Sequence, residues 1–348
     1  MDFRLTDDQI ALQTGLRELL EGRFGPERLR AAVAGAGSGA DDDGLPLWSE
    51  LSDAGLFSLR KPERSGQREG GLGLGLAEAV LAFEEVGRAL VPGPLVATEL
   101  ATVHASLPPH RAAGLCRRQP AGRGPLLVER LPALAVLLLP DTLTGEVRSL
   151  SPSALRARGR RGVDPLTPLW EVQGPLPDGE LLPGVDAGRL WAEGTLLTAA
   201  LQVGLAGRAV ATAVGYAKQR EQFGQPIGAF QAVQHLCADM LARTEPARAA
   251  VRAAAVGADA GVPTAELSVE IAGAKLLADQ AAVRGARDCL QVHGGMGFTW
   301  EADVHLLLKR AWVYEGSFAG TPESAELLAE GLSVAGLGHG AGHGVGHL

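Results

Sequence analysis

Residues 291–297 read Gln-Val-His-Gly-Gly-Met-Gly, and residues 220–224 read Arg-Glu-Gln-Phe-Gly. Each stretch is a short polar, glycine-rich interruption between long Ala/Leu/Val segments with helical spacing. Helix ends and glycines leave backbone N–H groups free to approach phosphate oxygens closely. The side chains of Arg220 and Gln291 add further hydrogen-bond donors. The pair therefore predicts a site for a phosphate-bearing cofactor, assembled on helices rather than on a Rossmann turn.

The bulk composition describes a globular chain. Its 348 residues, 46% of them hydrophobic, are enough for two or three structural units with a proper core. A net charge of −8 argues against wholesale nucleic-acid binding. The first residues show no signal-peptide pattern, and the longest apolar run, residues 133–139, is too short to cross a bilayer. We therefore expect a cytoplasmic protein that binds neither nucleic acid nor membrane.

Cysteine and histidine usage gives no metal signature. Three widely spaced cysteines form no Cys-x-x-Cys pair, which favours a reducing compartment and buried free thiols: Cys116, Cys237 and Cys289. Three histidines recur every four residues near the end of the chain: His339, His343 and His347. Glycines fill the gaps between them and oppose a helix there. We expect no metal, and a disordered Gly/His tail over residues 334–348.

Residues 1–101 are predicted to form an N-terminal helical domain. Thr6 and Gln9 have the spacing of a capping box, just before an apolar run. A further helix is expected over residues 76–89, closed by prolines. Residues 102–190 differ, because prolines cluster and short β-type segments appear. We predict a shortened middle β domain with one small sheet, formed by residues 134–139, 145–150 and 169–172.

The helical pattern returns in residues 191–333. Four long apolar-periodic segments separated by turn residues predict an up-and-down four-helix bundle: 192–218, 230–256, 264–290 and 299–315. The predicted fold class is thus mainly α with a small β domain. The two opening motifs fall between helices of this bundle.

This arrangement, with Arg-x-x-Phe-Gly and Gln-x-x-Gly-Gly on the bundle, resembles the acyl-CoA dehydrogenase family of flavoproteins. The resemblance is strongest in residues 200–316 and weakest in 102–190, and five stretches carry it: 203–206, 220–227, 230–235, 291–299 and 314–317. It implies an oxidoreductase of lipid metabolism that uses FAD for α,β-dehydrogenation of an acyl-CoA thioester. It also implies an electron-transfer acceptor protein as a partner.

The resemblance assigns roles to the two motifs. Arg220 corresponds to an arginine that reaches the FAD pyrophosphate, and Phe223 to a phenylalanine near the adenine. Gln291, Gly294 and Gly295 correspond to the segment along the ADP moiety. In the family these contacts go to the FAD of a neighbouring subunit, which implies an oligomer. A guanidinium and glycine-exposed amides suit a diphosphate. The alternative is that Arg220 caps its helix and the glycines only turn the chain.

The candidate catalytic base is Glu315, in the sequence Tyr-Glu-Gly-Ser. The reaction needs a base for the C2 proton, while FAD takes the hydride. Glu315 stands at the family's position for that carboxylate, on a predicted apolar stripe with Val304, Leu308 and Ala311. The alternative is a glutamate that turns to solvent at its helix end. Some family branches place the base on the first bundle helix, where Glu193 is the weaker candidate.

The middle domain departs from the family pattern. The Thr-Glu-Pro segment that seats the flavin ring has no counterpart between residues 100 and 130. Ser317 replaces a threonine near the flavin, but Ala319 stands where a polar amide is usual. The chain thus resembles the incomplete-site chains of actinobacterial heterotetramers linked to steroid side-chain breakdown. Our hypothesis is that Arg220 and Gln291 hold the ADP half of an FAD whose isoalloxazine ring lies in a homologous partner subunit.

Three other readings remain open. The chain is a self-sufficient homo-oligomeric dehydrogenase, if atypical middle-domain residues hold the flavin ring. It is a non-catalytic structural or regulatory paralogue, if it kept the fold and lost the chemistry. A flavin monooxygenase on the same scaffold would keep the FAD contacts without needing Glu315.

Overall fold

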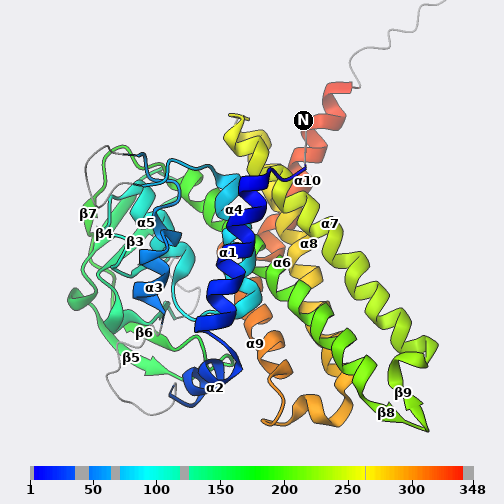
Figure 1. Cartoon of the computed structure of the whole chain (residues 1–348). Helices are drawn as coiled ribbons and strands as arrows, with labels where there is room; N and C mark the ends of the chain where they lie inside the picture. The colour runs from blue at the N-terminus through cyan, green and yellow to red at the C-terminus, as the bar shows by residue number, and fades with distance from the viewer. Residues whose placement is uncertain (1–3, 36–46, 64–70, 118–124, 263, 340–348) are drawn as a thin grey trace, which may run out of the picture.

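A computed structural model of the chain describes residues 4–35, 47–63, 71–117, 125–262 and 264–339. N-terminal helices, two small sheets and a long helical bundle follow one another along the chain. In Figure 1 the strands of the two small sheets lie on one side of the molecule and the bundle on the other, with α1 (Asp7–Arg23) and α4 (Leu76–Ala89) between them. The predicted fold class, mainly helical with a small β region, is confirmed.

The N-terminal helices begin where the sequence indicates. Gln9 N–H donates to Thr6 Oγ1 at 3.2 Å and Thr6 N–H donates to Gln9 Oε1 at 3.1 Å, so the predicted capping box opens α1. The helix expected over residues 76–89 is α4. The other helices of this region are shorter: α2 (Pro26–Gly35), α3 (Trp48–Asp53) and α5 (Leu95–His104).

The middle region contains two sheets instead of the single sheet predicted. A four-stranded sheet has the order β1 (Ala113–Leu115), β3 (Val136–Pro140), β4 (Val147–Leu150), β7 (Glu180–Leu181). A three-stranded sheet has the order β2 (Leu127–Glu129), β6 (Leu169–Gln173), β5 (Arg156–Arg160). β1 runs parallel to β3, and the remaining pairs are antiparallel.

The division into two sheets follows from burial. The predicted central strand is β3, whose consecutive leucines are buried on both faces of the strand: Leu137, Leu138 and Leu139. Such a strand needs cover on both sides. β5, in contrast, is largely exposed and carries arginines at alternate positions, so it lies in an outer sheet. Periodicity located β3, β4 and β6 but did not reveal that they belong to different sheets.

The bundle contains the predicted long helices: α6 (Ala187–Gln219), α7 (Gln231–Asp259), α8 (Thr264–His293) and α9 (Val304–Glu315). A fifth helix, α10 (Thr321–His339), packs along α8. The prediction of a disordered tail is therefore wrong for residues 334–339, because α10 continues through His339. Residues 340–348, with His343 and His347, lie outside the described residues.

Two glycines fix how the N-terminal helices meet the bundle. A Cβ added to Gly204 on α6 would lie 1.8 Å from Glu84 O, and one added to Gly87 on α4 would lie 2.1 Å from Leu201 O. Only glycine permits backbones to approach this closely. Asp259, at the end of α7, also accepts the N–H groups of Leu76 and Ala77 at 2.8 Å each and so caps α4.

α6 is the central helix of the core. By length and composition it is the one described helix apolar enough to cross a membrane, but 67% of its most apolar window is buried inside the fold. Its neighbours are α4, α7 and α8. Its apolar character is therefore explained by its place in the core.

Candidate functional site

The two sequence motifs meet at one end of the bundle. Arg220 directly follows the last residue of α6, and its N–H donates to Tyr216 O at 2.8 Å. A short hairpin follows, with strands β8 (Glu221–Gln222) and β9 (Gln225–Pro226). Phe223 and Gly224 form its turn at φ 56° and 81°, a left-handed geometry typical of two-residue hairpins. The aromatic side chain of Phe223 is 92% exposed.

The second motif reaches the same place from α8. Tyr216 on α6 stacks on His293 at the end of α8, with ring centroids 4.1 Å apart. Gln291 is exposed, and Gly294 and Gly295 open the 3-10 segment Gly294–Phe298. A Cβ at either glycine would meet nothing within 4 Å, so neither residue is covered on its side-chain side. The structure thus places five of the predicted cofactor-binding residues at one bundle end: Arg220, Phe223, Gln291, Gly294 and Gly295.

This bundle end is also apolar and exposed. Besides Phe223, the segment after α8 exposes three large side chains: Met296 at 43%, Phe298 at 75% and Trp300 at 67%. The Lys309 ammonium lies 4.3 Å from the Trp300 ring centroid. Among the described residues, no ion pair or side-chain hydrogen bond engages the Arg220 guanidinium. Exposed apolar side chains of this size beside a free cation are typical of a binding surface.

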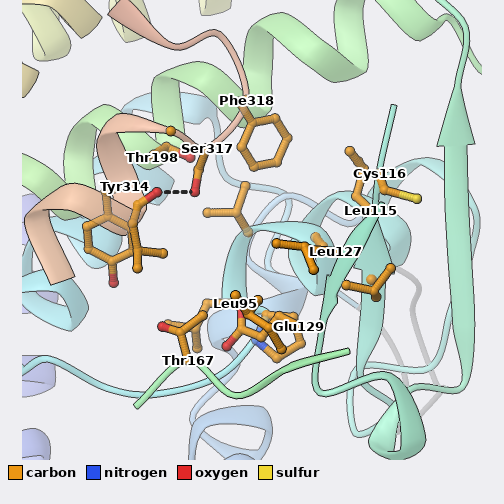
Figure 2. Close-up of a pocket in the computed structure, with 18 of the residues that line it drawn as sticks. Leu95, Leu115, Cys116, Leu127, Glu129, Thr167, Thr198, Tyr314, Ser317 and Phe318 are labelled. Carbon is orange, nitrogen blue, oxygen red and sulfur yellow. Dashed lines mark hydrogen bonds between the residues drawn. The ribbon is translucent and has the colours of Figure 1, made fainter. Parts of the chain in front are cut away.

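A cavity of about 460 Å³ lies elsewhere, between the middle strands and the C-terminal part of α9. Its walls come from the start of α5, from β1 and β2, from α6, and from the chain around the end of α9. Figure 2 shows Ser317 and Phe318 on one side of it and Glu129 with Thr167 on the opposite side. The predicted site residue Ser317 lines this cavity and donates to Val313 O at 2.7 Å. None of the five bundle-end residues lines it.

Part of the cavity wall comes from β1, which lies in the stretch between residues 100 and 130 where the sequence shows no flavin-seating motif. Gly114, Leu115 and Cys116 all face the cavity. The stretch between residues 100 and 130 therefore supplies backbone and apolar side chains to the site, although its sequence pattern departs from the family's. Burial raises the pKa of the Cys116 thiol to about 12, so this cysteine is an inert apolar wall.

Glu315 is half-buried at the last position of α9. Its neighbours Tyr314 and Gly316 line the cavity, whereas Glu315 is not among the lining residues. Below the helix end lies Lys275, fully buried, whose Nζ donates to Asp279 Oδ1 at 2.6 Å and to Tyr314 O at 3.2 Å. Burial lowers the pKa of Lys275, and the charges of Asp279 and Glu315 oppose that shift. Lys275 therefore fixes the backbone that carries Glu315.

Glu193, the alternative base, is locked in a buried ionic network. Its Oε2 lies 2.8 Å from Arg60 Nη1 and 2.7 Å from His104 Nε2, and its Oε1 accepts from Arg189 Nε at 2.8 Å. Burial would raise the pKa of Glu193, but the hydrogen bond from His104 and the charge of Arg60 outweigh it and hold the pKa at about 2. A carboxylate that weakly basic is poorly suited to abstract a proton. Arg60 also pairs with buried Glu99 at 2.6 Å.

The sequence analysis did not predict a cluster of buried polar residues beside the cavity. Arg310 on α9 is 2% exposed, and its Nε lies 2.7 Å from Asp164 Oδ2, an ion pair without the angle of a hydrogen bond. Asp164 accepts Thr167 Oγ1 at 2.7 Å. Glu129 on β2 keeps part of its surface exposed, but its Oε1 is buried. A sequence signal exists, since Arg310 lies on the same α9 face as Leu307 and Tyr314, where an unpaired arginine is costly.

Comparisons with known proteins match both ends of the chain. Residues 6–108 match the family model described as acyl-CoA dehydrogenase, N-terminal domain, and residues 190–329 match acyl-CoA dehydrogenase, C-terminal domain. Acyl-CoA dehydrogenase IpdE2 of Mycobacterium tuberculosis (strain ATCC 25618 / H37Rv) is 32% identical over 88% of this chain and 91% of its own. Acyl-CoA dehydrogenase FadE34 of the same organism is 35% identical over 91% of this chain. The chain spans only 47% of the length of FadE34.

Solved structures share the fold. One chain of a variant of the Tcur3481–Tcur3483 steroid ACAD superposes with a TM-score of 0.80 at 24% identity, covering 95% of this chain and 99% of that one. One chain of the ChsE4–ChsE5 complex from Mycobacterium tuberculosis gives 0.80 at 22% identity, covering 96% and 99%.

Proposed function

The chain belongs to the acyl-CoA dehydrogenase family, and on that premise we propose that it is one subunit of a mixed oligomer that dehydrogenates an acyl-CoA thioester with FAD at a subunit interface. Members of this family are flavoprotein oxidoreductases with FAD as the cofactor. The observation that carries the proposal is the separation of the bundle-end residues from the cavity within one chain. In the proposed oligomer, the other kind of subunit is a homologue of this chain.

The bundle end fits the ADP half of FAD. Arg220 offers an uncommitted guanidinium for the diphosphate, and Gly294 and Gly295 carry no side chain that would keep the ligand away from the chain there. Gln291 adds an exposed side-chain donor and acceptor. Phe223 presents an aromatic face that suits an adenine. Because these residues are exposed, they are accessible to a cofactor bound in a neighbouring subunit, which supports the proposed interface site.

The cavity fits the reacting groups of the cofactor and the acyl-CoA substrate. When bound, FAD supplies the hydride acceptor of the reaction. Ser317 Oγ has its hydrogen committed to Val313 O, so its lone pairs remain available as acceptors on the cavity wall. Glu315, at the last position of α9 between the cavity-lining residues Tyr314 and Gly316, is the proposed acceptor of the C2 proton. The Lys275 bond to Tyr314 O holds this helix end in place.

The two structural neighbours add support for a partner subunit. One names a steroid ACAD with two chain names, and the other a complex of two chains. By analogy, we assign this chain a homologous partner and an acyl-CoA substrate of the size of a ring-bearing acyl group. Reoxidation of the flavin calls for an electron-transfer acceptor protein. Free cysteines at Cys116, Cys237 and Cys289 fit the reducing cytoplasm.

The test is flavin content with and without a partner. The chain is purified alone and after co-expression with a homologous chain, and flavin absorbance is measured per protein. We expect little flavin alone and stoichiometric flavin in the mixed oligomer. Full FAD occupancy in the chain alone would instead indicate a self-sufficient homo-oligomeric dehydrogenase. Absence of flavin from both preparations would indicate a non-catalytic paralogue.

A matched pair of variants locates the cofactor contact. Arg220→Gln removes the guanidinium at the end of α6, and Lys218→Gln removes another exposed cation two residues earlier. We expect the mixed oligomer with Arg220→Gln to lose flavin affinity about tenfold or more, since a charged hydrogen bond to phosphate is worth roughly 1.5–3 kcal/mol. The Lys218→Gln oligomer should retain wild-type affinity. Equal retention in both variants would exclude Arg220 as the diphosphate contact.

A further inference from the structure

A second hollow, the α1–α4–α6 pocket, lies between α1, the C-terminal half of α4 and the second half of α6, with a volume of about 390 Å³. The turn between α1 and α2, residues 24–26, contributes a further wall. In Figure 1, α1 runs beside α4, and α2 follows at the lower end of α1. The pocket shares no lining residue with the cavity beside α9, so it is a separate space.

The close crossing of α4 and α6 brings two arginines together in this pocket. A Cβ added to Gly204 on α6 would lie 2.7 Å from Arg88 N on α4, and Arg208 follows Gly204 by one helical turn on the same face. The Arg208 guanidinium accordingly reaches Arg88, where its Nη1 donates to Arg88 O at 3.1 Å. Both arginines are half-buried, and both line the pocket.

The carboxylates nearest to these arginines are engaged elsewhere. Two of them stand one turn before Arg88 on α4, and the third is the acid whose charge reaches Arg208. Each is paired with other arginines: Glu84 with Arg248 and Arg252, Glu85 with Arg17, and Asp303 with Arg30. Among the described residues, neither Arg88 nor Arg208 forms an ion pair. The pocket therefore contains two cationic groups without a compensating carboxylate.

This arrangement leaves excess positive charge on the pocket wall. Burial lowers the pKa of Arg208, and the charge of Arg88 adds to that effect, against the opposing charge of Asp303. Arginine stays protonated in proteins, so both charges persist. Arg17 also lines the pocket, together with two glutamates, Glu85 and the exposed Glu21. The wall thus carries a net positive charge in a chain whose net charge is −8, and an anion bound there would relieve the repulsion.

The rest of the wall is apolar. Leu20 and Phe24 are buried side chains that line the pocket, and Pro26, Ala89 and Ala211 add further apolar surface. Apolar walls with a few charged groups are typical of small-molecule sites. The guanidinium group presents a planar set of donors that matches the oxygens of a carboxylate or a phosphate. The expected ligand therefore has an oxyanion group on a short apolar body.

We propose that the α1–α4–α6 pocket binds a small amphipathic anion, whose oxyanion group is held by Arg88 and Arg208. Its apolar body lies against Leu20, Phe24 and Pro26. A carboxylate has two oxygens and a phosphate has more, so the two guanidinium groups bind the ligand without reaching a common atom. The inference is independent of the proposed dehydrogenation, because it uses no residue of the bundle end or of the cavity beside α9.

Other classes of ligand match the pocket less well. A cation adds to the repulsion between Arg88 and Arg208. A neutral alcohol of the same length fills the apolar part but leaves the two charges uncompensated. An inorganic anion compensates the charges but leaves the apolar surface of Leu20 and Phe24 uncovered. Only an amphipathic anion satisfies both parts of the wall.

The test is a ligand-observed NMR titration of the full chain, without flavin or CoA, with hexanoate, hexyl phosphate, 1-hexanol and hexylammonium. We expect the better of the two anions to bind about tenfold or more tightly than 1-hexanol, as a charged hydrogen bond predicts, and hexylammonium to bind more weakly than 1-hexanol. Comparison of hexanoate with hexyl phosphate identifies the head group. The preference for the anion should decrease as NaCl is raised from about 0.05 M to about 0.5 M. Equal affinity of the anions and 1-hexanol, or no binding of either anion, overturns the proposal.

Three variants locate the bound anion. Arg208→Gln removes one guanidinium, and Ala211→Phe fills the pocket from an exposed position on α6 without changing its charge. Each should weaken binding of the preferred anion about tenfold or more. Arg111→Gln, which removes an exposed charge before β1, should retain wild-type affinity. Wild-type affinity in both Arg208→Gln and Ala211→Phe would place the anion elsewhere and overturn the proposal. If Arg208→Gln does not fold, Ala211→Phe decides alone.

Discussion

Tyr216 on α6 and His293 on α8 stack with ring centroids 4.1 Å apart and ring planes 22° from parallel. The contact joins helices whose ends carry the two motifs, so it sets the distance between Arg220 and Gln291. His293 is itself oriented by a 2.8 Å hydrogen bond between its Nδ1 and Cys289 O. The stack is thus a structural support for the bundle-end surface formed by Arg220, Phe223, Gln291, Gly294 and Gly295.

Replacing Tyr216 with Ala should therefore weaken both stability and flavin binding. Loss of the ring contact and its buried area is expected to reduce the free energy of unfolding by about 1–3 kcal/mol. Flavin affinity of the mixed oligomer should fall as the two motifs lose their fixed spacing. Tyr216→Phe keeps the stack and is the control. Denaturant unfolding and flavin titration report the two effects, and wild-type flavin affinity in Tyr216→Ala would show that the stack is not needed for the site.

Glu315→Gln should abolish substrate-dependent bleaching of the flavin in the mixed oligomer. Removing a general base typically slows its step by about 10²–10⁴-fold. The measurement is the rate of flavin bleaching after mixing with an acyl-CoA that bleaches the wild-type oligomer. Glu301→Gln, which changes an exposed glutamate before α9, should bleach at the wild-type rate. An unchanged rate in Glu315→Gln would exclude this residue as the base and favour a reaction that does not need it.

Glu193→Gln should act on stability and its pH dependence. The mutation leaves buried Arg60 with only Glu99 as an acidic partner, and breaking a buried ion pair costs about 3–5 kcal/mol. The pKa of Glu193 is depressed from its usual 4.5 to about 2, so its stabilising effect is complete above pH 4.5 and is lost as pH falls toward 2. Acid unfolding of the wild type should therefore be steeper in this window than that of Glu193→Gln.

The same variant separates a structural role from a catalytic one. If Glu193 only supports the fold, folded Glu193→Gln in the mixed oligomer should bleach its flavin at a rate close to wild type. A loss of bleaching as large as that of Glu315→Gln, with flavin content retained, would instead identify Glu193 as the base.

Gly204→Ala should disrupt the crossing of α4 and α6. The added methyl group would lie 1.8 Å from Glu84 O, and the helices must separate to admit it. Overpacking of this kind costs about 1–3 kcal/mol or prevents folding. Gly215→Ala, on the same helix but with nothing within 4 Å of the added Cβ, should raise stability by about 0.5–1 kcal/mol. Thermal unfolding of the two variants should move the melting temperature in opposite directions.

Much of the helical framework was readable from local patterns. α4 has the predicted bounds, and the capping box at Thr6 opens α1. These features depend on residues within a turn or two of one another, so periodicity and capping chemistry suffice to find them. α10 was the exception, because its several glycines disfavour a helix that packing along α8 nevertheless stabilises.

The cavity could not be read in the same way. Glu129, Asp164 and Arg310 are more than thirty residues apart in sequence, and each looks like an ordinary surface charge on its own strand, loop or helix. Similarly, Glu193 has the position of a candidate base, and only its long-range partners Arg60 and His104 show that it is a buried ion-pair partner. The pKa of each carboxyl group depends on burial and on charges that the chain brings together from distant segments.

The sequence by itself determined the family resemblance, the helices of the bundle, and the two motifs at the bundle end. These features depend on residue type and on spacing between residues that are close in the chain. The tertiary structure decided which carboxyl groups are paired, that the bundle-end surface and the cavity are separate, and that the Arg310–Asp164 ion pair is buried beside the cavity. Those features arise from contacts between distant segments, where desolvation and Coulomb interactions depend on three-dimensional distance.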